Sequence, residues 1–323
     1  MRKGRILITG SGGFVGGFLS GELVDKLGKD SVVLMTRNKM ILNTDEEIRL
    51  KYLPSIDVLE YEELFKKYEI STVIHCAGIP KERLLPWKVY EEVNVEWPYK
   101  LLKALMHVEG EKFIFISSLG VYGTAPQYIP ADESHPFAPD GKYHLSKALA
   151  EQRLISEVLD GRNVVNLYIL RCNAVYGHGD HGVLEKIVCL YSKKLLLTRK
   201  DMLISFCSLG LLEEVVEKII MENVGDLVLN VTEPPIRMMD LIQRLRDSSI
   251  EGNMLHFDLA WKFSWASFWI PVLYNKYALL FLDRIYSFER LEKFLGRKVY
   301  PLEYLDKCIG YYRGIARKCS RRR

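Results

Sequence analysis

The chain has 323 residues, of which 48% are hydrophobic and 27% charged, and its formal net charge is +4. This composition is that of a globular protein with room for a large core and a second lobe. So small a charge gives no ground for a nucleic-acid partner. The first five residues lead straight into a predicted strand without a signal-peptide pattern, so we expect a cytoplasmic protein.

Six cysteines are spread along the chain with no close pair and no metal-ligand spacing, and four of them lie in apolar runs. We therefore expect no metal site, and buried free thiols in a reducing compartment. The six are Cys76, Cys172, Cys189, Cys207, Cys308 and Cys319.

Short apolar runs alternate with helical periodicity through the first two-thirds of the chain. The predicted strands are 5–9, 31–36, 72–76, 112–117, 163–171 and 226–231. The predicted helices are 14–27, 61–68, 87–107, 143–159 and 211–223. This alternation predicts an α/β fold, a Rossmann-type doubly wound parallel sheet with helices on both faces.

The regular alternation ends near Ala174, and the last third reads as helical and rich in aromatic residues. We predict a Rossmann domain formed by residues 1–173 and 203–232. A smaller, mainly helical substrate-binding lobe would then be discontinuous, formed by residues 174–202 and 233–323.

A glycine turn follows the first predicted strand and opens the first predicted helix. Glycines permit a tight turn and let the backbone approach a pyrophosphate, and the helix N-terminus supplies N–H groups and a positive dipole end. This order of strand, turn and helix predicts a dinucleotide site. Its residues are Gly10, Gly12, Gly13, Phe14, Val15 and Gly16.

The end of the second predicted strand is where such sites read the adenosine ribose, and no carboxylate stands there. Arg37 could pair with a 2′-phosphate and Thr36 could donate a hydrogen bond to it. These residues favour NADP(H), with NAD(H) as the alternative. An exposed loop cation is the other interpretation of Arg37.

Ser118, Tyr143 and Lys147 form a candidate catalytic set. Tyr143 and Lys147 are four residues apart and so share one helix face. A neighbouring ammonium favours the phenolate form of a tyrosine, and the lysine can also hold a cofactor ribose. Ser118, at a strand end, can bond the substrate oxygen while Tyr143 acts as general acid or base during hydride transfer.

With these motifs the chain resembles the extended short-chain dehydrogenase/reductases of the nucleotide-sugar epimerase/dehydratase family, to about residue 235. The resemblance also covers 117–123 and 170–177. It implies that Asp57 and Val58 touch adenine, that Asn94 supports the central helix near the cofactor, and that Asn173 contacts a sugar-nucleotide diphosphate. It adds Cys76, Ala77 and Gly78 as residues lining the cofactor.

Two departures from the family pattern narrow the reaction. Dehydratases of the family carry an acidic pair after the serine, where this chain has Leu119 and Gly120, so a 4,6-dehydratase is disfavoured. Members that invert carbons 3 and 5 use a cysteine at the position of Gly120, so that chemistry is disfavoured too. Gly120 remains a candidate substrate contact.

Four functions remain open. We favour a sugar-nucleotide 4-ketoreductase, because the missing acid after the second strand points to NADPH. The alternative is a nucleotide-sugar 4-epimerase with tightly bound NAD. A dehydrogenase of a non-sugar alcohol and a non-catalytic dinucleotide sensor are further alternatives. The resemblance also implies a homodimer through helices 87–107 and 143–159.

Two later features have competing interpretations. His178 is either a substrate contact or a polar loop residue. Residues 263–282 are aromatic and apolar, but Pro271, Asn275 and Lys276 interrupt them, so a membrane span is disfavoured. The segment either packs within the lobe or, with the basic C-terminal tail, makes a peripheral contact at the inner membrane surface.

Overall fold

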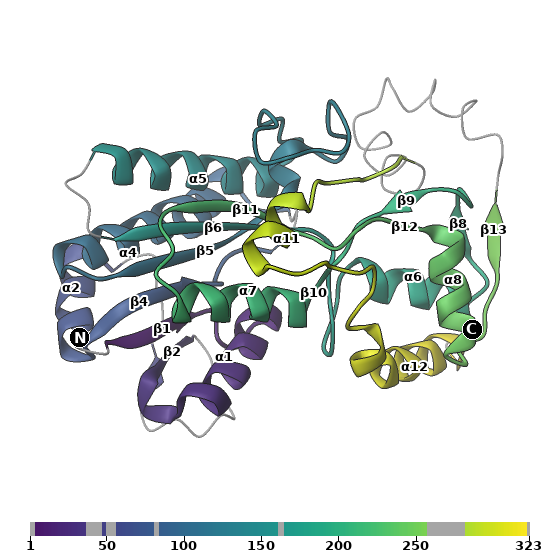
Figure 1. The fold of residues 1–323 in the computed structure, drawn as a ribbon, viewed down its shortest axis with the longest axis horizontal. Helices are drawn as coiled ribbons and strands as arrows, with labels where there is room; N and C mark the ends of the chain where they lie inside the picture. The colour runs from purple at the N-terminus through teal and green to yellow at the C-terminus, as the bar shows by residue number, and fades with distance from the viewer. Residues whose placement is uncertain are drawn as a thin grey trace. The chain divides into compact units, whose positions relative to one another are not determined.

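The computed structural model describes residues 4–36, 47–49, 56–80, 84–160, 165–256 and 282–321. Its largest element is a seven-stranded sheet with the order β11-β6-β5-β4-β1-β2-β3 (Figure 1). In chain order the strands are β1 (Arg5–Thr9), β2 (Val32–Thr36), β3 (Glu47–Arg49), β4 (Ile70–His75), β5 (Lys112–Ser118), β6 (Asn166–Cys172) and β11 (Leu227–Val231). All six strands predicted from the sequence are present, and the predicted doubly wound fold is confirmed.

The strand order reverses between β1 and β4. Strand β1 pairs in parallel with β2 on one side and with β4 on the other, and β4 pairs in parallel with β5. Such a switch point leaves a crevice outside the carboxyl ends of the two strands, where α/β sheets bind their ligands. The glycine turn that begins at Gly10 and the segment that begins at Cys76 both start there.

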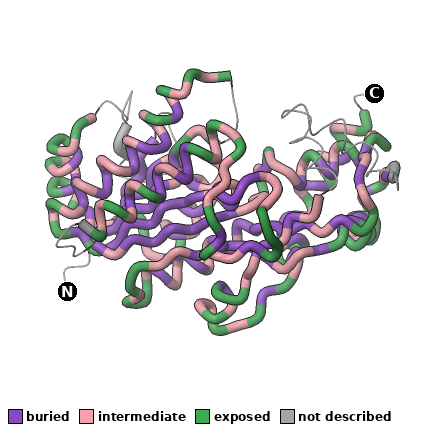
Figure 2. Tube along the Cα trace, turned by 90° about the horizontal axis from the view of Figure 1, so that it is seen from above, coloured by how far each residue is buried: buried purple, intermediate pink, exposed green. Residues whose placement is uncertain are grey.

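Helices cover both faces of the sheet, so the strands are nearly all apolar. All five residues of β2 are buried, as parallel strands between two helical layers require. Helices α2 (Val58–Lys67), α4 (Trp97–His107) and α5 (Lys142–Asp160) lie on one face, and α1 (Phe14–Leu27) and α7 (Leu209–Met221) on the other (Figure 1). Figure 2 shows the buried strands between helices whose outer sides are exposed.

The predicted helix 87–107 is divided into three parts. It begins as α3 (Trp87–Tyr90), continues as a π-helical segment, η3 (Glu91–Glu96), and ends as α4. Short π segments inside α-helices occur often at functional sites. Here the segment holds Asn94, whose side chain is buried.

The described chain forms two compact units. Unit 1 comprises residues 1–121, 139–171 and 213–229, and unit 2 comprises 122–138, 172–212 and 230–323. The predicted domain boundaries placed four stretches in the Rossmann domain that cluster with unit 2, namely 122–138, 172–173, 203–212 and 230–232. The predicted division therefore remains a proposal about where the substrate lobe begins.

In the part of the chain that the structure describes, unit 2 has a core of its own and contains helices and three two-stranded sheets. The described helices are α6 (Val183–Ser192), α8 (Met238–Asp247), α11 (Glu289–Leu295) and α12 (Leu305–Arg321). The sheets pair β7 (Val175–Tyr176) with β10 (Cys207–Ser208), β9 (Leu203–Ile204) with β12 (Ile236–Arg237), and β8 (Leu196–Thr198) with β13 (Met254–His256).

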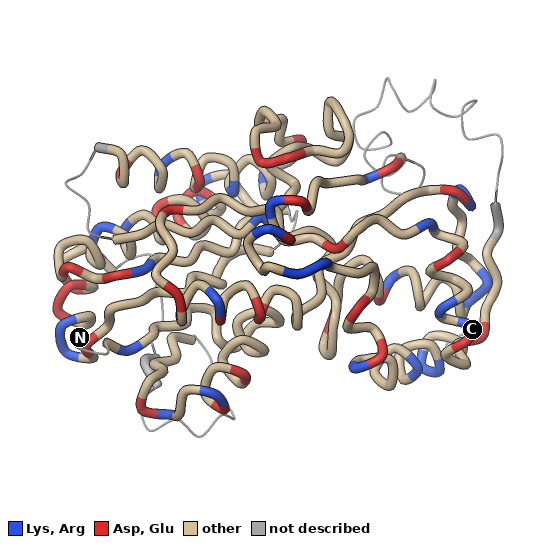
Figure 3. The backbone as a smooth tube through the Cα atoms, viewed as in Figure 1, with Lys and Arg blue, Asp and Glu red and all other residues tan. Residues whose placement is uncertain are grey.

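Helix α12 separates apolar and cationic residues. Its inner face buries Leu305, Cys308, Tyr312 and Ala316, spaced three or four residues apart, as expected for a helix packed along one stripe. Its exposed positions carry five cations, visible in blue along α12 in Figure 3. They are Lys307, Arg313, Arg317, Lys318 and Arg321.

Candidate functional site

The glycine turn has a backbone that only glycine fits at two positions. Gly10 has φ +68°, and a Cβ there would lie 2.7 Å from the backbone of Ala77. A Cβ on Gly16 would lie 2.3 Å from the Gly10 carbonyl oxygen. Gly13 is the N-cap of α1 and no side chain caps that helix. The turn therefore presents uncapped N–H groups, which suits an anion such as a pyrophosphate.

Thr36 ends β2 against this turn. Its side chain is buried, and a Cβ on Gly12 would lie 3.0 Å from its Oγ1. Ser11 Oγ donates to the Met35 carbonyl, which joins the turn to β2. Arg37, on which the prediction of NADP(H) depends, lies outside the described residues.

The end of β4 is held to β1 by a buried polar contact. Thr9 Oγ1 lies 2.9 Å from His75 Nδ1, and the Ala77 N–H donates to the same hydroxyl. Burial and the Lys147 ammonium hold the pKa of His75 well below its usual range, so the ring is neutral. His75 thus makes a hydrogen bond within the core of unit 1.

Asn94 connects the segment after β4 to helix α5. Its Oδ1 accepts from the Ile79 N–H, and its Nδ2 donates to the Ile79 carbonyl and to Ser146 Oγ. Ser146 Oγ in turn donates to the Tyr143 carbonyl. Asn94 thus fixes both the loop that carries Gly78 and the first turn of α5. A direct contact of Asn94 with a cofactor remains a prediction.

The candidate catalytic residues lie in unit 1, on β5 and α5. Lys147 is 6% exposed; its Nζ donates to the Ile116 carbonyl at 2.8 Å and lies 4.4 Å from the centre of the Phe115 ring. Ser118 ends β5 and its Oγ accepts from the Gly120 N–H. Tyr143 is one helical turn before Lys147 and is half-buried. Lys147 therefore lies on the same helix as Tyr143, and its ammonium is bound to the carbonyl of Ile116, two residues before Ser118 in β5.

A buried ion pair supports this set, and the sequence reasoning missed it. Glu151, fully buried, accepts from Arg171 Nε at 2.9 Å and from Ser117 Oγ. The three residues join α5 to β5 and β6. Glu151 follows Tyr143 and Lys147 at the same four-residue spacing, which is the signal that could have identified it.

An imidazole covers Gly120. An ideal Cβ on Gly120 would lie 2.2 Å from His144 Cδ2 and 2.3 Å from Nε2. His144 Nδ1 lies 2.5 Å from Asp140 Oδ1, one helical turn earlier. The family resemblance implies an acid or a cysteine at position 120 in members with other chemistry. In this chain the His144 ring occupies the space of that side chain.

The other predicted cofactor residues have structural contacts of their own. Asp57 is the N-cap of α2, and its Oδ1 accepts from the Glu60 N–H at 2.9 Å. Val58 is the first residue of α2 and is partly buried. Cys76 forms no disulfide and has intermediate exposure. Contacts of these residues with adenine or nicotinamide remain predictions.

Two of the predicted substrate residues, Asn173 and His178, lie in unit 2. Asn173 Nδ2 donates to the Ser205 carbonyl at 2.9 Å. His178 is exposed, and its ring centre lies 5.1 Å from that of Tyr311. Substrate contact by either residue remains a prediction.

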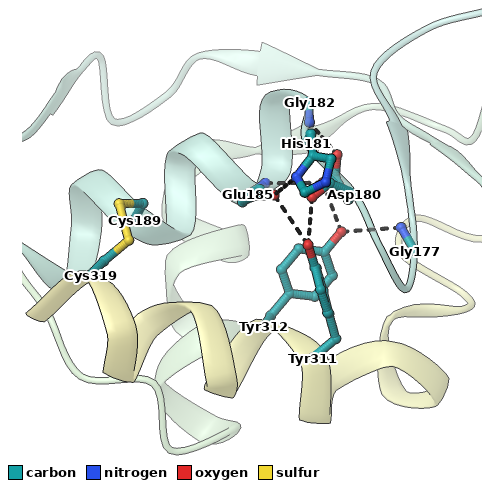
Figure 4. A network of polar contacts seen from close by, with 9 residues as sticks. All are labelled: Gly177, Asp180, His181, Gly182, Glu185, Cys189, Tyr311, Tyr312 and Cys319. Atoms are coloured by element: carbon teal, nitrogen blue, oxygen red, sulfur yellow. Dashed lines mark hydrogen bonds and ion pairs between the residues drawn. A yellow bond between two sulfur atoms is a disulfide. The ribbon is translucent and has the colours of Figure 1, made fainter. Parts of the chain in front are cut away.

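A polar network and a disulfide join α6 to α12 (Figure 4). Buried Asp180 accepts from the Tyr312 hydroxyl at 2.9 Å and from the N–H groups of Gly182 and Glu185. Burial raises the pKa of both Asp180 and Tyr312. The Tyr311 hydroxyl donates to the Asp180 carbonyl at 2.6 Å.

The disulfide connects Cys189 of α6 to Cys319 of α12. The prediction that all six cysteines are free thiols is therefore wrong for this pair. It failed because the two residues are 130 positions apart and only the packing of α12 on α6 brings them together. Among the described residues the remaining four cysteines form no disulfide, and three of these four are buried.

The described part of the chain contains neither a metal-binding group of side chains nor a membrane-spanning helix. Within it, no group of three or more histidine, cysteine or acidic side chains is arranged to hold a metal ion. None of its helices combines the length and the apolarity needed to cross a bilayer. Residues 263–281, the aromatic segment discussed above, lie outside the described ranges.

A family model described as the NAD-dependent epimerase/dehydratase family matches residues 6–206, more than half of the chain. The chain belongs to this family. The resemblance inferred from the glycine turn and the Tyr143–Lys147 pair is confirmed, and the chain has the sequence of an enzyme of this class.

Curated relatives match part of their length. A putative UDP-glucose 4-epimerase of Methanocaldococcus jannaschii is 29% identical over 190 residues, which cover 56% of this chain and 60% of that protein. The UDP-glucose 4-epimerase of Vibrio cholerae is 29% identical over 205 residues, covering 58% of this chain and 57% of the relative. The chain thus spans little more than half the length of the curated relatives that it matches.

Solved structures match along nearly the whole chain. MoeE5 in complex with UDP-glucose and NAD has a TM-score of 0.73 at 18% identity, covering 98% of this chain and 99% of that one. UDP-glucuronic acid 4-epimerase from Bacillus cereus, in complex with NAD, has a TM-score of 0.72 at 18% identity, covering 97% and 96%. These likenesses confirm the fold.

Proposed function

We propose that this protein is a nucleotide-sugar 4-epimerase that acts on a UDP-linked sugar and recycles a bound NAD. Named relatives by sequence are UDP-glucose 4-epimerases, and structural neighbours hold NAD with UDP-sugars. The observation that carries the proposal is the Ser118, Tyr143 and Lys147 set beside a glycine turn suited to a pyrophosphate. We expected a 4-ketoreductase from Arg37, but the relatives named above are 4-epimerases and do not support net reduction with NADPH.

The glycine turn supports binding of a dinucleotide. A side chain at Gly10 or Gly16 would collide with the backbone of Ala77 or of Gly10, so the glycines keep the turn tight, and the uncapped start of α1 follows it. In this proposal the turn holds the pyrophosphate, and Lys147, with the segment Cys76–Gly78, lies against the nicotinamide half. When bound, NAD supplies a hydride acceptor and donor at the sugar carbon.

Tyr143 exchanges the proton of the reacting sugar hydroxyl. The ammonium of Lys147 favours the phenolate, so Tyr143 can accept that proton as the carbon is oxidised and return it on reduction. Ser118 Oγ bonds the same sugar oxygen and keeps it in line with Tyr143. Asn173 and His178 of unit 2 are the proposed contacts to the nucleotide and the sugar.

Residues 119 and 120 limit what else this site can do. Leu119 is buried and apolar, and Gly120 has no side chain, so no second acid follows Ser118. Elimination of water needs such an acid to protonate the leaving hydroxyl. The proposal therefore requires one proton-exchanging residue, which Tyr143 supplies.

The proposal is tested with purified protein and no added cofactor. Bound nucleotides are released by heat and identified by mass spectrometry, and UDP-glucose, UDP-N-acetylglucosamine and UDP-glucuronic acid are each incubated with the enzyme. We expect retained NAD and conversion of at least one sugar to its C4 epimer. An empty protein that oxidises NADPH only with a 4-keto sugar nucleotide would replace the proposal by the ketoreductase.

Two further features are proposals that the same preparation can test. A homodimer through α4 and α5 predicts twice the monomer mass in light scattering. A peripheral contact of the cationic α12 face, with 263–282, predicts cosedimentation with anionic vesicles that salt abolishes. Failure of the protein to sediment with the vesicles at low salt would refute the membrane contact. The proposed location would then be cytoplasmic without attachment to the membrane.

A further inference from the structure

The space beside Gly120 is filled by an imidazole from another element. Gly120 donates its N–H to Ser118 Oγ at 3.1 Å, so both belong to one turn at the end of β5. The His144 ring edge, with Cδ2 and Nε2, occupies the volume that a residue-120 side chain would take. The His144 imidazole therefore occupies the place of a residue-120 side chain, on the turn that carries Ser118.

Asp140 fixes the orientation of this ring. Its Oδ1 lies 2.5 Å from His144 Nδ1, so the carboxylate accepts from Nδ1–H and directs Nε2 away from itself. Both side chains are about one-quarter exposed, at 26% and 27%. Within the described residues Nε2 makes no hydrogen bond. The pair thus presents an oriented, partly exposed ring nitrogen with its hydrogen-bonding capacity unused.

His144 also adjoins the proposed general acid and base. It follows Tyr143 in the chain, and the two ring centres lie 5.5 Å apart. The imidazole therefore lies beside Tyr143 and against Gly120, whose N–H donates to Ser118 Oγ, and Ser118 and Tyr143 are the two residues proposed to hold the reacting sugar oxygen. A sugar whose reacting oxygen were held by Ser118 and Tyr143 would bring a substituent of the neighbouring ring carbon toward Nε2.

We propose that His144 is a substrate-binding residue whose Nε2 hydrogen-bonds the hydroxyl on the sugar carbon adjacent to the reacting one, with Asp140 as its positioning residue. The proposal rests on the proposed function for the location of the sugar. It also explains why residue 120 is glycine: a side chain there would displace the ring.

Kinetics separate this role from a structural one. We expect His144→Ala to raise KM for the converted UDP-sugar, or lower kcat/KM, by roughly 10-fold or more. His144→Gln, which keeps a polar atom in place of the ring nitrogen, should recover most of the loss, and Asp140→Asn should fall between. The dissociation constant of UDP, which lacks the sugar, should stay unchanged in all three.

The matched control is His107→Ala. His107 Nδ1 forms the same kind of pair, 2.7 Å from Glu62 Oε1, but on α4 away from the turn. This variant should leave KM, UDP affinity and NAD content unchanged. If His144→Ala behaves like His107→Ala, or if UDP affinity and NAD content fall with the melting temperature, the inference is overturned.

A binding measurement keeps the inference separate from the proposed function. In nitrogen-15 spectra, the Nε2 resonance assigned through His144→Gln should shift when a UDP-sugar is added and not when UDP is added. A shift without any epimerisation would defeat the proposed function and support the inference. Epimerisation without a shift would do the reverse.

The position of the ring is tested by a double-mutant cycle. Gly120→Ala alone should lower the melting temperature, because its methyl group would meet the His144 ring. In the His144→Ala background the same change should cost much less, since the space is then open. Additive losses would show that the ring does not occupy this volume and would overturn the inference.

Discussion

Lys147 shows how a single residue can combine folding and chemistry. Its ammonium is nearly inaccessible to water, donates to the Ile116 carbonyl and lies over the Phe115 ring. A buried cation is stable only with such partners. Sequence spacing predicted the pair with Tyr143. It could not predict the carbonyl and the ring, because these come from β5, about thirty residues away in the chain.

The first prediction concerns this pair. Tyr143→Phe should lower kcat by roughly 10²–10⁴-fold, because the only proposed proton-exchanging group is lost. The UDP dissociation constant and the NAD content should be preserved. Retention of more than a tenth of wild-type kcat would mean that another group moves the proton.

Glu233 provides a second prediction at this scale. It is buried in unit 2, where its carboxylate accepts from Tyr176 OH at 3.0 Å and from the Leu302 N–H at 2.8 Å. Burial raises its pKa to about 7. The folded state then binds more protons than the unfolded chain between about pH 4.5 and 7, so stability should fall as pH rises through that window.

The size of this effect is about 3 kcal/mol if the whole shift is expressed in the free energy of unfolding. Urea unfolding at several pH values from 4.5 to 8 measures it. In Glu233→Gln, which cannot ionise, the pH dependence in this window should flatten. A variant with the wild-type slope would assign the dependence to other groups.

At the scale of elements, local patterns predicted the large strands and helices and missed the small ones. Strand β1 and helix α1 have their predicted bounds, because an apolar run and a helical period each span enough residues. The two-residue strands of unit 2 are too short to show a hydrophobic periodicity in the sequence. The predicted helix 87–107 contains η3, where Asn94 bonds to Ile79 and Ser146, contacts that depend on the tertiary fold.

The Cys189–Cys319 disulfide gives a prediction about one helix. Closing a loop of this length can stabilise the folded state by up to about 5 kcal/mol, through the entropy of the unfolded chain. We expect Cys319→Ser, or a reductant, to lower the melting temperature and speed amide exchange in the last turns of α12. Adding reductant to Cys319→Ser should change nothing further. A reductant-insensitive wild type would contradict the bond.

At the scale of the whole molecule, the sequence was sufficient to predict the family and the fold. It was not sufficient to decide between a reductase and an epimerase. The glycine turn and Tyr143–Lys147 identify the family because their chemistry depends on short spacings. The choice between reductase and epimerase depended on Arg37, which the structure does not describe. The named relatives favour the epimerase instead.

The most direct test uses UDP-glucose deuterated at C4 as substrate, with no added cofactor, and product analysis by NMR and mass spectrometry. If UDP-glucose proves not to be converted, the accepted UDP-sugar is labelled in the same way. The account predicts the C4 epimer with deuterium retained at C4, because the hydride that leaves the sugar returns to the same carbon. Product formed only with added NADPH, or epimer that has lost its deuterium, would contradict a recycled NAD.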